Sequence, residues 1–145
     1  MAFDNARNVI MVSDNTGANN RHRYEIAASE AVLPGDVLLE GAAAIGLATD
    51  ETEATAIADV KVYAAPVSGV AMDEQEFAAD DLVRYFIPLP GDVVRVATGA
   101  TAFTAGEYVG VAAGKGVVAL GIATAFGLCL EDAASGDSHV LTRVL

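Results

Sequence analysis

The chain has 145 residues, a size typical of one domain that buries its core without disulfides or metals. Its 20 acidic and 8 basic residues give a net charge of −12, which argues against nucleic-acid binding, because phosphate contacts need clustered Lys and Arg. Without an apolar run of about 20 residues or a signal-peptide core, the chain is expected to be soluble, made in the cytoplasm and independent of membranes.

The first 23 residues differ in composition from the rest of the chain. Asparagines, Asp4, Asp14 and Gly17 punctuate them, and these residue types favour turns. A short strand is predicted inside this region, over Asn8–Ser13. We expect residues 1–23 to form an extended N-terminal arm that orders on a partner. The alternative is a first strand followed by a long surface loop.

From Tyr24 onward, short β-prone runs alternate with Gly, Pro and Asp, and residues 24–145 are expected to form one β-rich domain. One segment, Glu51–Val62, is the best helix candidate, although its β-branched residues weaken it. The pattern predicts a mostly β fold, a single-domain β-sandwich or β-barrel with a short helix at most. The expected strands are Tyr24–Ala27, Asp36–Glu40, Ala44–Thr49, Ala65–Ala71, Leu82–Pro88, Asp92–Ala97, Tyr108–Ala112, Gly116–Ala125 and His139–Leu145.

A turn motif recurs along the chain. Leu33-Pro-Gly-Asp-Val37 returns as Leu89-Pro-Gly-Asp-Val93, and Phe77–Asp81 and Phe103–Glu107 are looser versions. Pro presets the second turn position, Gly accepts a positive φ at the third, and the acid stands at the mouth of the next strand. The 56-residue offset between the close copies indicates either a duplicated β unit or a common turn used twice.

Two segments resemble ligand sites superficially. Gly110–Gly116 contains a Gly-Lys pair, but its spacing differs from a phosphate-binding loop and Gly116 replaces the required Ser or Thr. A hairpin turn over Ala113–Gly116 is the better interpretation. An acidic cluster lacks the glycine of a calcium loop and is interpreted as a solvated face, with divalent binding between copies left open. That cluster comprises Asp73, Glu74, Glu76, Asp80 and Asp81.

No pattern in the sequence predicts catalysis. Cys129 lies in an apolar run and is expected to be a buried thiol. His22 and His139 lie in polar stretches without a catalytic spacing. We therefore predict no catalytic residue, no metal site and no cofactor, and a protein that is not an enzyme.

Several runs carry a family resemblance. Ala64–Ala71, Asp81–Pro88 and Pro90–Val94 resemble segments of the small capsid decoration, or cement, proteins of tailed viruses. So does the ending, where Gly127–Asp132 leads through a small acidic turn to a last strand, His139–Leu145. The likeness covers roughly residues 30–145. It implies a β-rich domain that binds the outside of the mature capsid of a tailed bacteriophage or archaeal virus and reinforces it, often as a trimer.

The implied partners are the major capsid protein and further copies of the chain, and the implied location is the capsid exterior of the virion. Arg84 and Arg95 lie in apolar strands, where pairs with Asp81 or Asp92, or subunit contacts, are expected. The candidate contacts to the capsid or to an adjacent copy are Arg7, Arg21, Arg23, Arg84 and Arg95.

Other functions stay open at this point. A turret, fibre-base or tail component of a virion fits the same features. A cellular β-barrel that binds a small ligand also fits, although sparse aromatics argue mildly against it. The lysine-poor, acid-rich composition, with Lys61 and Lys115 the only lysines, suits either a salt-loving host or an ordinary acidic protein.

Overall fold

The computed structural model describes residues 10–14, 21–60 and 76–145 and confirms the mostly β class. Helical structure in this part of the chain is limited to short 3₁₀ turns, η2 (Glu51–Glu53) and η4 (Ile122–Thr124). The strands are β1 (Met11–Ser13), β2 (Tyr24–Ala27), β3 (Val37–Glu40), β4 (Ile45–Leu47), β5 (Ala56–Ala58), β6 (Leu82–Phe86), β7 (Val93–Ala97), β8 (Tyr108–Ala112), β9 (Lys115–Val118), β10 (Gly127–Cys129) and β11 (His139–Val144).

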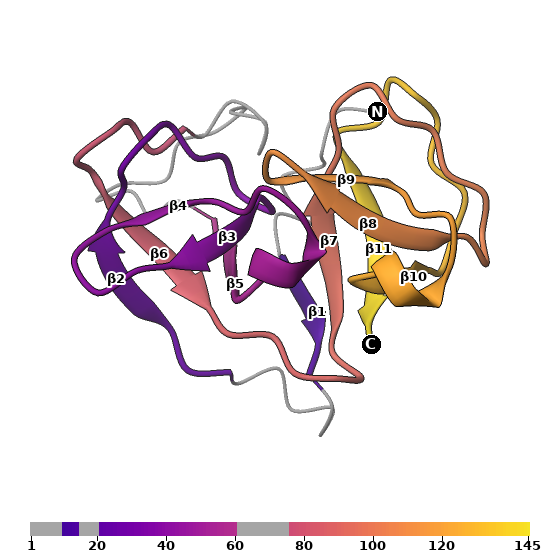
Figure 1. The fold of residues 1–145 in the computed structure, drawn as a ribbon, viewed down its shortest axis with the longest axis horizontal. Coiled ribbons are helices and arrows are strands. Elements are labelled where there is room, and N and C mark those ends of the chain that lie inside the picture. Colours follow the sequence, from indigo (N-terminus) through magenta and orange to yellow (C-terminus); the bar gives the residue numbers. More distant parts are fainter. Residues whose placement is uncertain (1–9, 15–20, 61–75) are drawn as a thin grey trace.

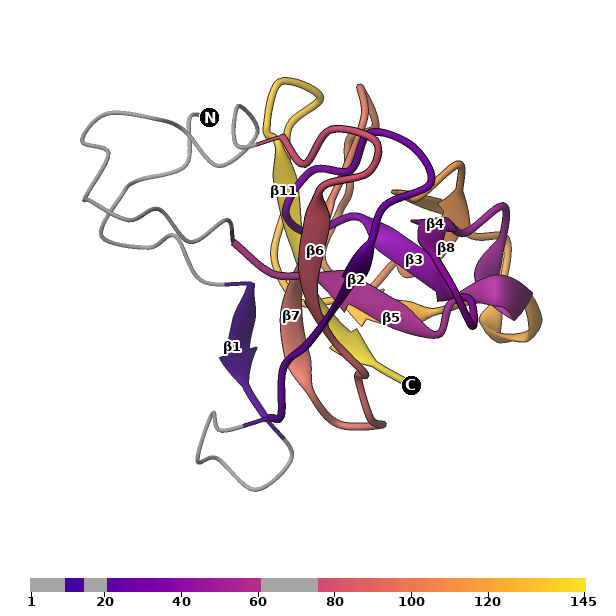
Figure 2. The ribbon, with the colours of Figure 1, turned by 90° about the vertical axis from the view of Figure 1, so that its left-hand side faces the viewer.

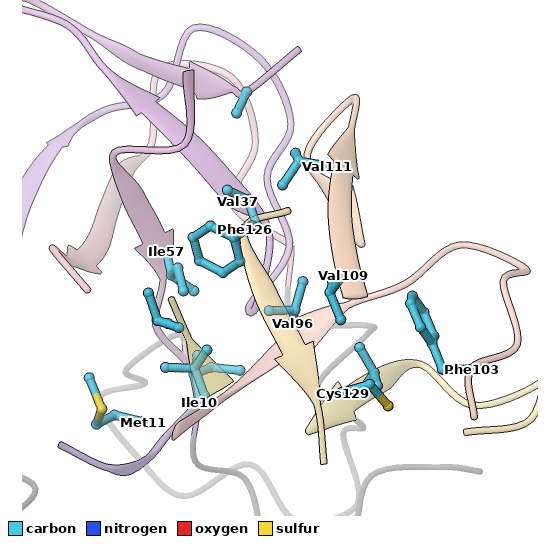
Figure 3. Packing of buried hydrophobic residues seen from close by; sticks show 14 of the residues in the cluster. Ile10, Met11, Val37, Ile57, Val96, Phe103, Val109, Val111, Phe126 and Cys129 are labelled. Carbon is cyan, nitrogen blue, oxygen red and sulfur yellow. The ribbon is translucent and has the colours of Figure 1, made fainter. Parts of the chain in front are cut away.

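The strands form two sheets that lie side by side along the long axis of the molecule (Figure 1). One has the order β2-β6-β5-β3-β4 and the other the order β1-β7-β11-β10-β8-β9, with antiparallel pairing between neighbouring strands. Figure 2 shows the first sheet from its outer side. The main hydrophobic cluster draws on both sheets, with Val37, Ile57 and Phe86 from one and Val96 and Val109 from the other (Figure 3). The sheets therefore share this cluster, while a second cluster, which includes Val32, Leu38 and Val83, belongs to the first sheet alone.

β1 lies within the strand expected over residues 8–13 and pairs with β7 at the edge of the six-stranded sheet. Ile10 and Met11 are completely buried in the main cluster. Removing residues 10–14 would therefore remove part of the core. The remainder of the predicted arm up to residue 20 lies outside the described residues.

The helix expected over Glu51–Val62 is wrong. Only Glu51–Glu53 forms a single 3₁₀ turn, capped by the Asp50 side chain, and the chain then enters β5. The three residues of β5 are fully buried beside β3 and β6, so burial in the sheet overrides helix propensity here. The strand expected over Gly116–Ala125 is also too long, since β9 ends at Val118 and η4 follows. The strand expected over residues 65–71 lies outside the described residues.

The two sheets repeat one topology. Strands β2-β6-β5-β3-β4 correspond one by one to β7-β11-β10-β8-β9. The 3₁₀ turns also correspond, because η2 joins β4 to β5 and η4 joins β9 to β10. We call residues 24–86 the first unit and residues 93–144 the second unit. β1 is an additional edge strand of the second unit.

The strand registers support this correspondence. The pair Leu38 with Leu47 matches Val109 with Val118, an offset of 71 positions (38 to 109 and 47 to 118). After β5 the offset falls to 56 (77 to 133), because the bridge between Val32 and Phe77 matches the one between Phe103 and Ala133. The first unit therefore contains extra chain between β5 and β6.

Five turns in the described chain share one hydrogen-bond pattern. In each, the amide of the fourth residue, an acid, donates to the carbonyl of the first at 3.0 Å. The acid's carboxylate accepts the amide of the first residue at 2.8–2.9 Å. The third residue has a positive φ in four of them, as at Gly35 (87°) and Asp80 (73°). The turns are Leu33–Asp36, Ala78–Asp81, Leu89–Asp92, Thr104–Glu107 and Ala134–Asp137.

Each of these turns leads into a strand, so the predicted strand-initiating turn is confirmed in all four predicted places. The duplication is also present, but the two Leu-Pro-Gly-Asp-Val copies are not equivalent positions in it. The turn at Leu33 precedes β3 and corresponds to the turn at Thr104 before β8, whereas the turn at Leu89 precedes β7, which corresponds to β2.

Candidate functional site

Three of the five arginines singled out in the sequence, Arg21, Arg23 and Arg84, form ion pairs with buried aspartates near β2, β6 and β7. Arg21 lies just before β2, and its Nη2 donates to Oδ1 of Asp92 at 2.8 Å. Asp92 is fully buried in the turn that starts β7. Arg21 therefore neutralises a carboxylate that has no exposure to water.

A second ion-pair group surrounds Asp59, which follows β5. Nε of Arg23 donates to Oδ2 of Asp59 at 2.7 Å, and Nε of Arg84 lies 3.6 Å from the same oxygen. The Arg23 guanidinium also stacks over the Phe86 ring, 4.9 Å from its centroid. Arg84 is thus paired with Asp59, not with Asp81 or Asp92 as expected, because β5 and β6 are neighbours and the Asp59 amide donates to the Arg84 carbonyl.

These arginines keep part of their side chains exposed, from 19% at Arg23 to 39% at Arg84. A shallow hollow beside them is lined by Arg21, His22, Tyr24, Ile87 and Leu89. Of the remaining two arginines, Arg95 is half-buried on β7, and Arg7 lies outside the described residues. The structure thus gives three candidate contact residues a role inside the fold, while part of each side chain stays exposed.

The tip of the β8–β9 hairpin of the second unit contacts the first unit. The predicted hairpin turn is confirmed, with positive φ at Ala113 (48°) and Gly114 (79°). The Val37 amide donates to the Gly114 carbonyl at 2.8 Å, and the Gly114 amide donates to the Ala48 carbonyl at 2.8 Å. A Cβ at Gly114 would lie 2.6 Å from Cδ2 of Leu47, so the tip sits directly on β4.

An ion pair to a buried carboxylate also stabilises this contact. Nζ of Lys115 donates to the carboxylate of Asp36, which is 1% exposed. Burial raises the pKa of Asp36 above 3.8, and Lys115 acts in the opposite direction. Nε2 of His139 also lies 2.8 Å from the Pro34 carbonyl. Sequence reasoning missed this contact between the units, because Asp36 and Lys115 are 79 positions apart.

The groups considered for catalysis or metal binding stay dispersed. Of the acidic cluster, Asp81 serves its own turn, and Asp73 and Glu74 lie outside the described residues. Among residues 10–14, 21–60 and 76–145, no group of three or more His, Cys, Asp or Glu is placed to hold a metal ion. Cys129 is buried, its thiol donates to the Glu131 carbonyl at 2.9 Å, and burial raises its pKa. In the same part of the chain, no helix has the length and apolarity that crossing a membrane requires.

Comparison with known proteins shows a likeness at the level of fold. No family model and no curated protein matches the sequence. Among solved structures, the fold is similar to the crystal structure of the head fiber gp8.5 N base in bacteriophage phi29, with a TM-score of 0.58. The match covers 86% of this chain and 94% of that chain, at 17% sequence identity. At this identity the likeness is one of fold alone.

Proposed function

We propose that this chain is a virion structural protein that binds the outside of the mature capsid shell and stabilises it, as a homotrimer. The observation that carries the proposal is the fold shared with a bacteriophage head fibre base over 86% of the chain. The proposed partners are the major capsid protein and further copies of the chain. The protein acts by binding, without catalysis and without a cofactor.

The charge of the chain suits this role. The net charge is −12, and among the acids that the structure describes all but Asp14, Asp36, Asp59 and Asp92 are exposed or partly exposed. Many copies on one shell would give the particle a strongly acidic outer surface. Such a surface keeps particles apart in solution by mutual repulsion.

A fibre-base component is the second candidate function. The similar solved protein is itself described as the base of a head fibre, which favours this reading over other virion parts. The two roles predict different stoichiometry, because a decoration protein covers the shell whereas a fibre base occupies selected positions on it.

The proposal is tested by adding purified protein to capsids that lack it. Saturable co-sedimentation with the shell, together with a higher temperature of capsid disruption, is expected. Absence of binding to shells at any salt concentration would overturn the proposal. Free major capsid protein serves as a control, because a decoration protein binds the assembled lattice.

The same assay tests the expected contact by the N-terminal arm. A deletion of residues 1–9 removes Arg7 and keeps Ile10 and Met11, which belong to the core. Deleting all of residues 1–23 would confuse binding with folding, because Arg21 and Arg23 also pair with buried aspartates. We expect the shorter deletion to weaken shell binding with an unchanged melting temperature. Undiminished binding would refute the arm contact.

A further inference from the structure

The contact between the two units has a direction. It joins a hairpin tip of the second unit to what we call the receiving edge of the first unit. By the 71-residue offset, each unit carries both parts. The hairpin tips are Gly41–Ala44 in the first unit and Ala112–Lys115 in the second. The receiving edges are Asp36, Val37, Leu47, Ala48 and Thr49 in the first unit and Glu107, Tyr108, Val118, Ala119 and Leu120 in the second.

Only one of the two possible pairings forms within the chain. The second tip occupies the first receiving edge through backbone hydrogen bonds to Val37, Ala48 and Thr49. The reverse contact has no counterpart among the hydrogen bonds of the described residues, where neither Ala42 nor Ala43 bonds to the second unit. The first tip and the second receiving edge therefore remain available.

Exposure of the two edges agrees with this asymmetry. Val37 and Ala48 are completely buried under the second tip, whereas their counterparts Tyr108 and Ala119 are partly exposed. Farther along the second edge, Val118 is 42% and Leu120 104% exposed. In the first unit the position of Leu120 is held by Thr49. An apolar edge thus faces solvent in the second unit only.

The free parts lie at opposite ends of the molecule. In Figure 1 the first tip, between β3 and β4, lies at the left-hand end, and η4, which follows the second receiving edge, lies on the right beside β10. A chain therefore cannot close this contact on itself, but one copy can offer its tip to the receiving edge of the next.

The side chains at the free parts are compatible in size and place no like charges against each other. Inside the chain, Gly114 of the tip contacts Leu47 of the edge. Between copies, Ala43 of the tip would contact Val118 of the edge. The tip residue is then larger by one carbon and the edge residue smaller by one carbon, so the total side-chain volume at the contact is nearly the same. Residues 108–130 contain no Asp or Glu. This stretch is where an acidic neighbour can approach without carboxylate repulsion.

We propose that copies of this chain associate head to tail, with the Gly41–Ala44 tip of one copy seated on the Val118–Leu120 edge of the next. The contact would use the same two parts as the one already made between the units, but without its ion pair, because Ala44 and Glu107 hold the positions of Lys115 and Asp36. Such heterologous contacts build a closed ring when the rotation permits. The ring size of three rests on the proposed function, whereas the surface itself is argued from the fold. Association should strengthen with salt, because each copy carries a net charge of −12.

Engineered cysteines test the direction of the contact. Cys129 is buried, so Ala43→Cys and Val118→Cys introduce the accessible thiols of the described chain. Under mild oxidation the double variant should form a covalent ladder that ends at a closed ring. Neither single variant should cross-link to itself, and a mixture of the two should stop at the dimer. Self-linking of either single variant, or no linking of the mixture, overturns the proposal. Ala43→Cys with Leu82→Cys, an exposed position on β6, is the control that should not link.

A second measurement follows association without covalent trapping. Leu120→Thr gives the second unit the residue that the first unit has at the equivalent position, Thr49, so the substitution carries a low risk of misfolding. Sedimentation equilibrium in molar salt should show association weakened about tenfold or more, as expected when one buried leucine is lost. Leu82→Thr should leave it unchanged. A wild-type chain that stays monomeric at high concentration, or equal effects of both variants, overturns the proposal. Shell binding is measured separately, so failure of the ring contact and failure of the virion role remain distinguishable.

Discussion

Replacing Arg21 with Met removes the cation from a carboxylate that has no access to water. The pair distance is 2.8 Å and the Asp92 side chain is 0% exposed, so the Coulomb attraction is about 6 kcal/mol at an effective dielectric constant of about 20. Loss of one partner from such a pair costs about 3–5 kcal/mol, because the remaining charge stays buried. The matched control is Arg84→Met. Asp59 keeps Arg23 at 2.7 Å when Arg84 is removed, and Arg84 is 39% exposed, so the expected cost is about 1 kcal/mol or less.

Urea unfolding followed by circular dichroism at one fixed high salt concentration measures both variants. Arg21→Met should also lower the melting temperature by on the order of 10 °C. The double variant Arg21→Met with Asp92→Asn removes the buried charge and should recover part of the loss. Equal destabilisation by Arg21→Met and Arg84→Met would refute the argument that burial of Asp92 sets the magnitude.

Three more predictions concern the repeated turns and the charge. Gly35 and Gly106 occupy equivalent turns with φ of +87° and +93°, but only at Gly35 would an added Cβ meet the His139 ring, at 2.7 Å. In thermal unfolding, Gly106→Ala should therefore cost about 1 kcal/mol and Gly35→Ala clearly more. Equal costs would contradict this. Burial raises the folded-state pKa of Asp36 above 3.8, so the stability that protonated Asp36 contributes is complete below pH 3.8 and is lost as the pH rises through the folded pKa. The unfolding free energy of the wild type minus that of Asp36→Asn should therefore fall as the pH rises over this range. A difference that rises with pH would contradict the direction of the pKa shift. The melting temperature should rise from low to molar salt because the net charge of −12 is screened, and an unchanged value would count against an adaptation to high salt.

The local chemistry of the turns was predictable from sequence, and the pairing of distant segments was not. The turns in Leu33–Val37 and Phe103–Glu107 are stabilised by their own residues, because the acid's carboxylate accepts a hydrogen bond from the amide three residues earlier. β5 and β10, each three residues long, carry no such local signal and exist because neighbouring strands flank them. Short buried strands of this kind depend on tertiary context more than on propensity.

The duplication was visible in sequence only as a recurrent turn. Equivalent backbone hydrogen bonds recur within each unit, although few residue identities do. In the first unit the Thr55 amide donates to the Leu38 carbonyl, and at the matching place in the second unit the Phe126 amide donates to the Val109 carbonyl. The offset also changes after β5, so a search at one fixed period finds part of the repeat. The ion pairs of Arg21 and Arg23 were beyond the sequence for a similar reason, because their partners are 71 and 36 positions away.

The virion role is tested most directly by the copy number of this chain relative to the major capsid protein in purified particles from the genome that encodes it. Quantitative mass spectrometry of those particles gives the ratio. The account predicts about as many copies of this chain as of the coat protein. A handful of copies would instead assign it to a fibre base, and absence from the particles would contradict a virion role altogether.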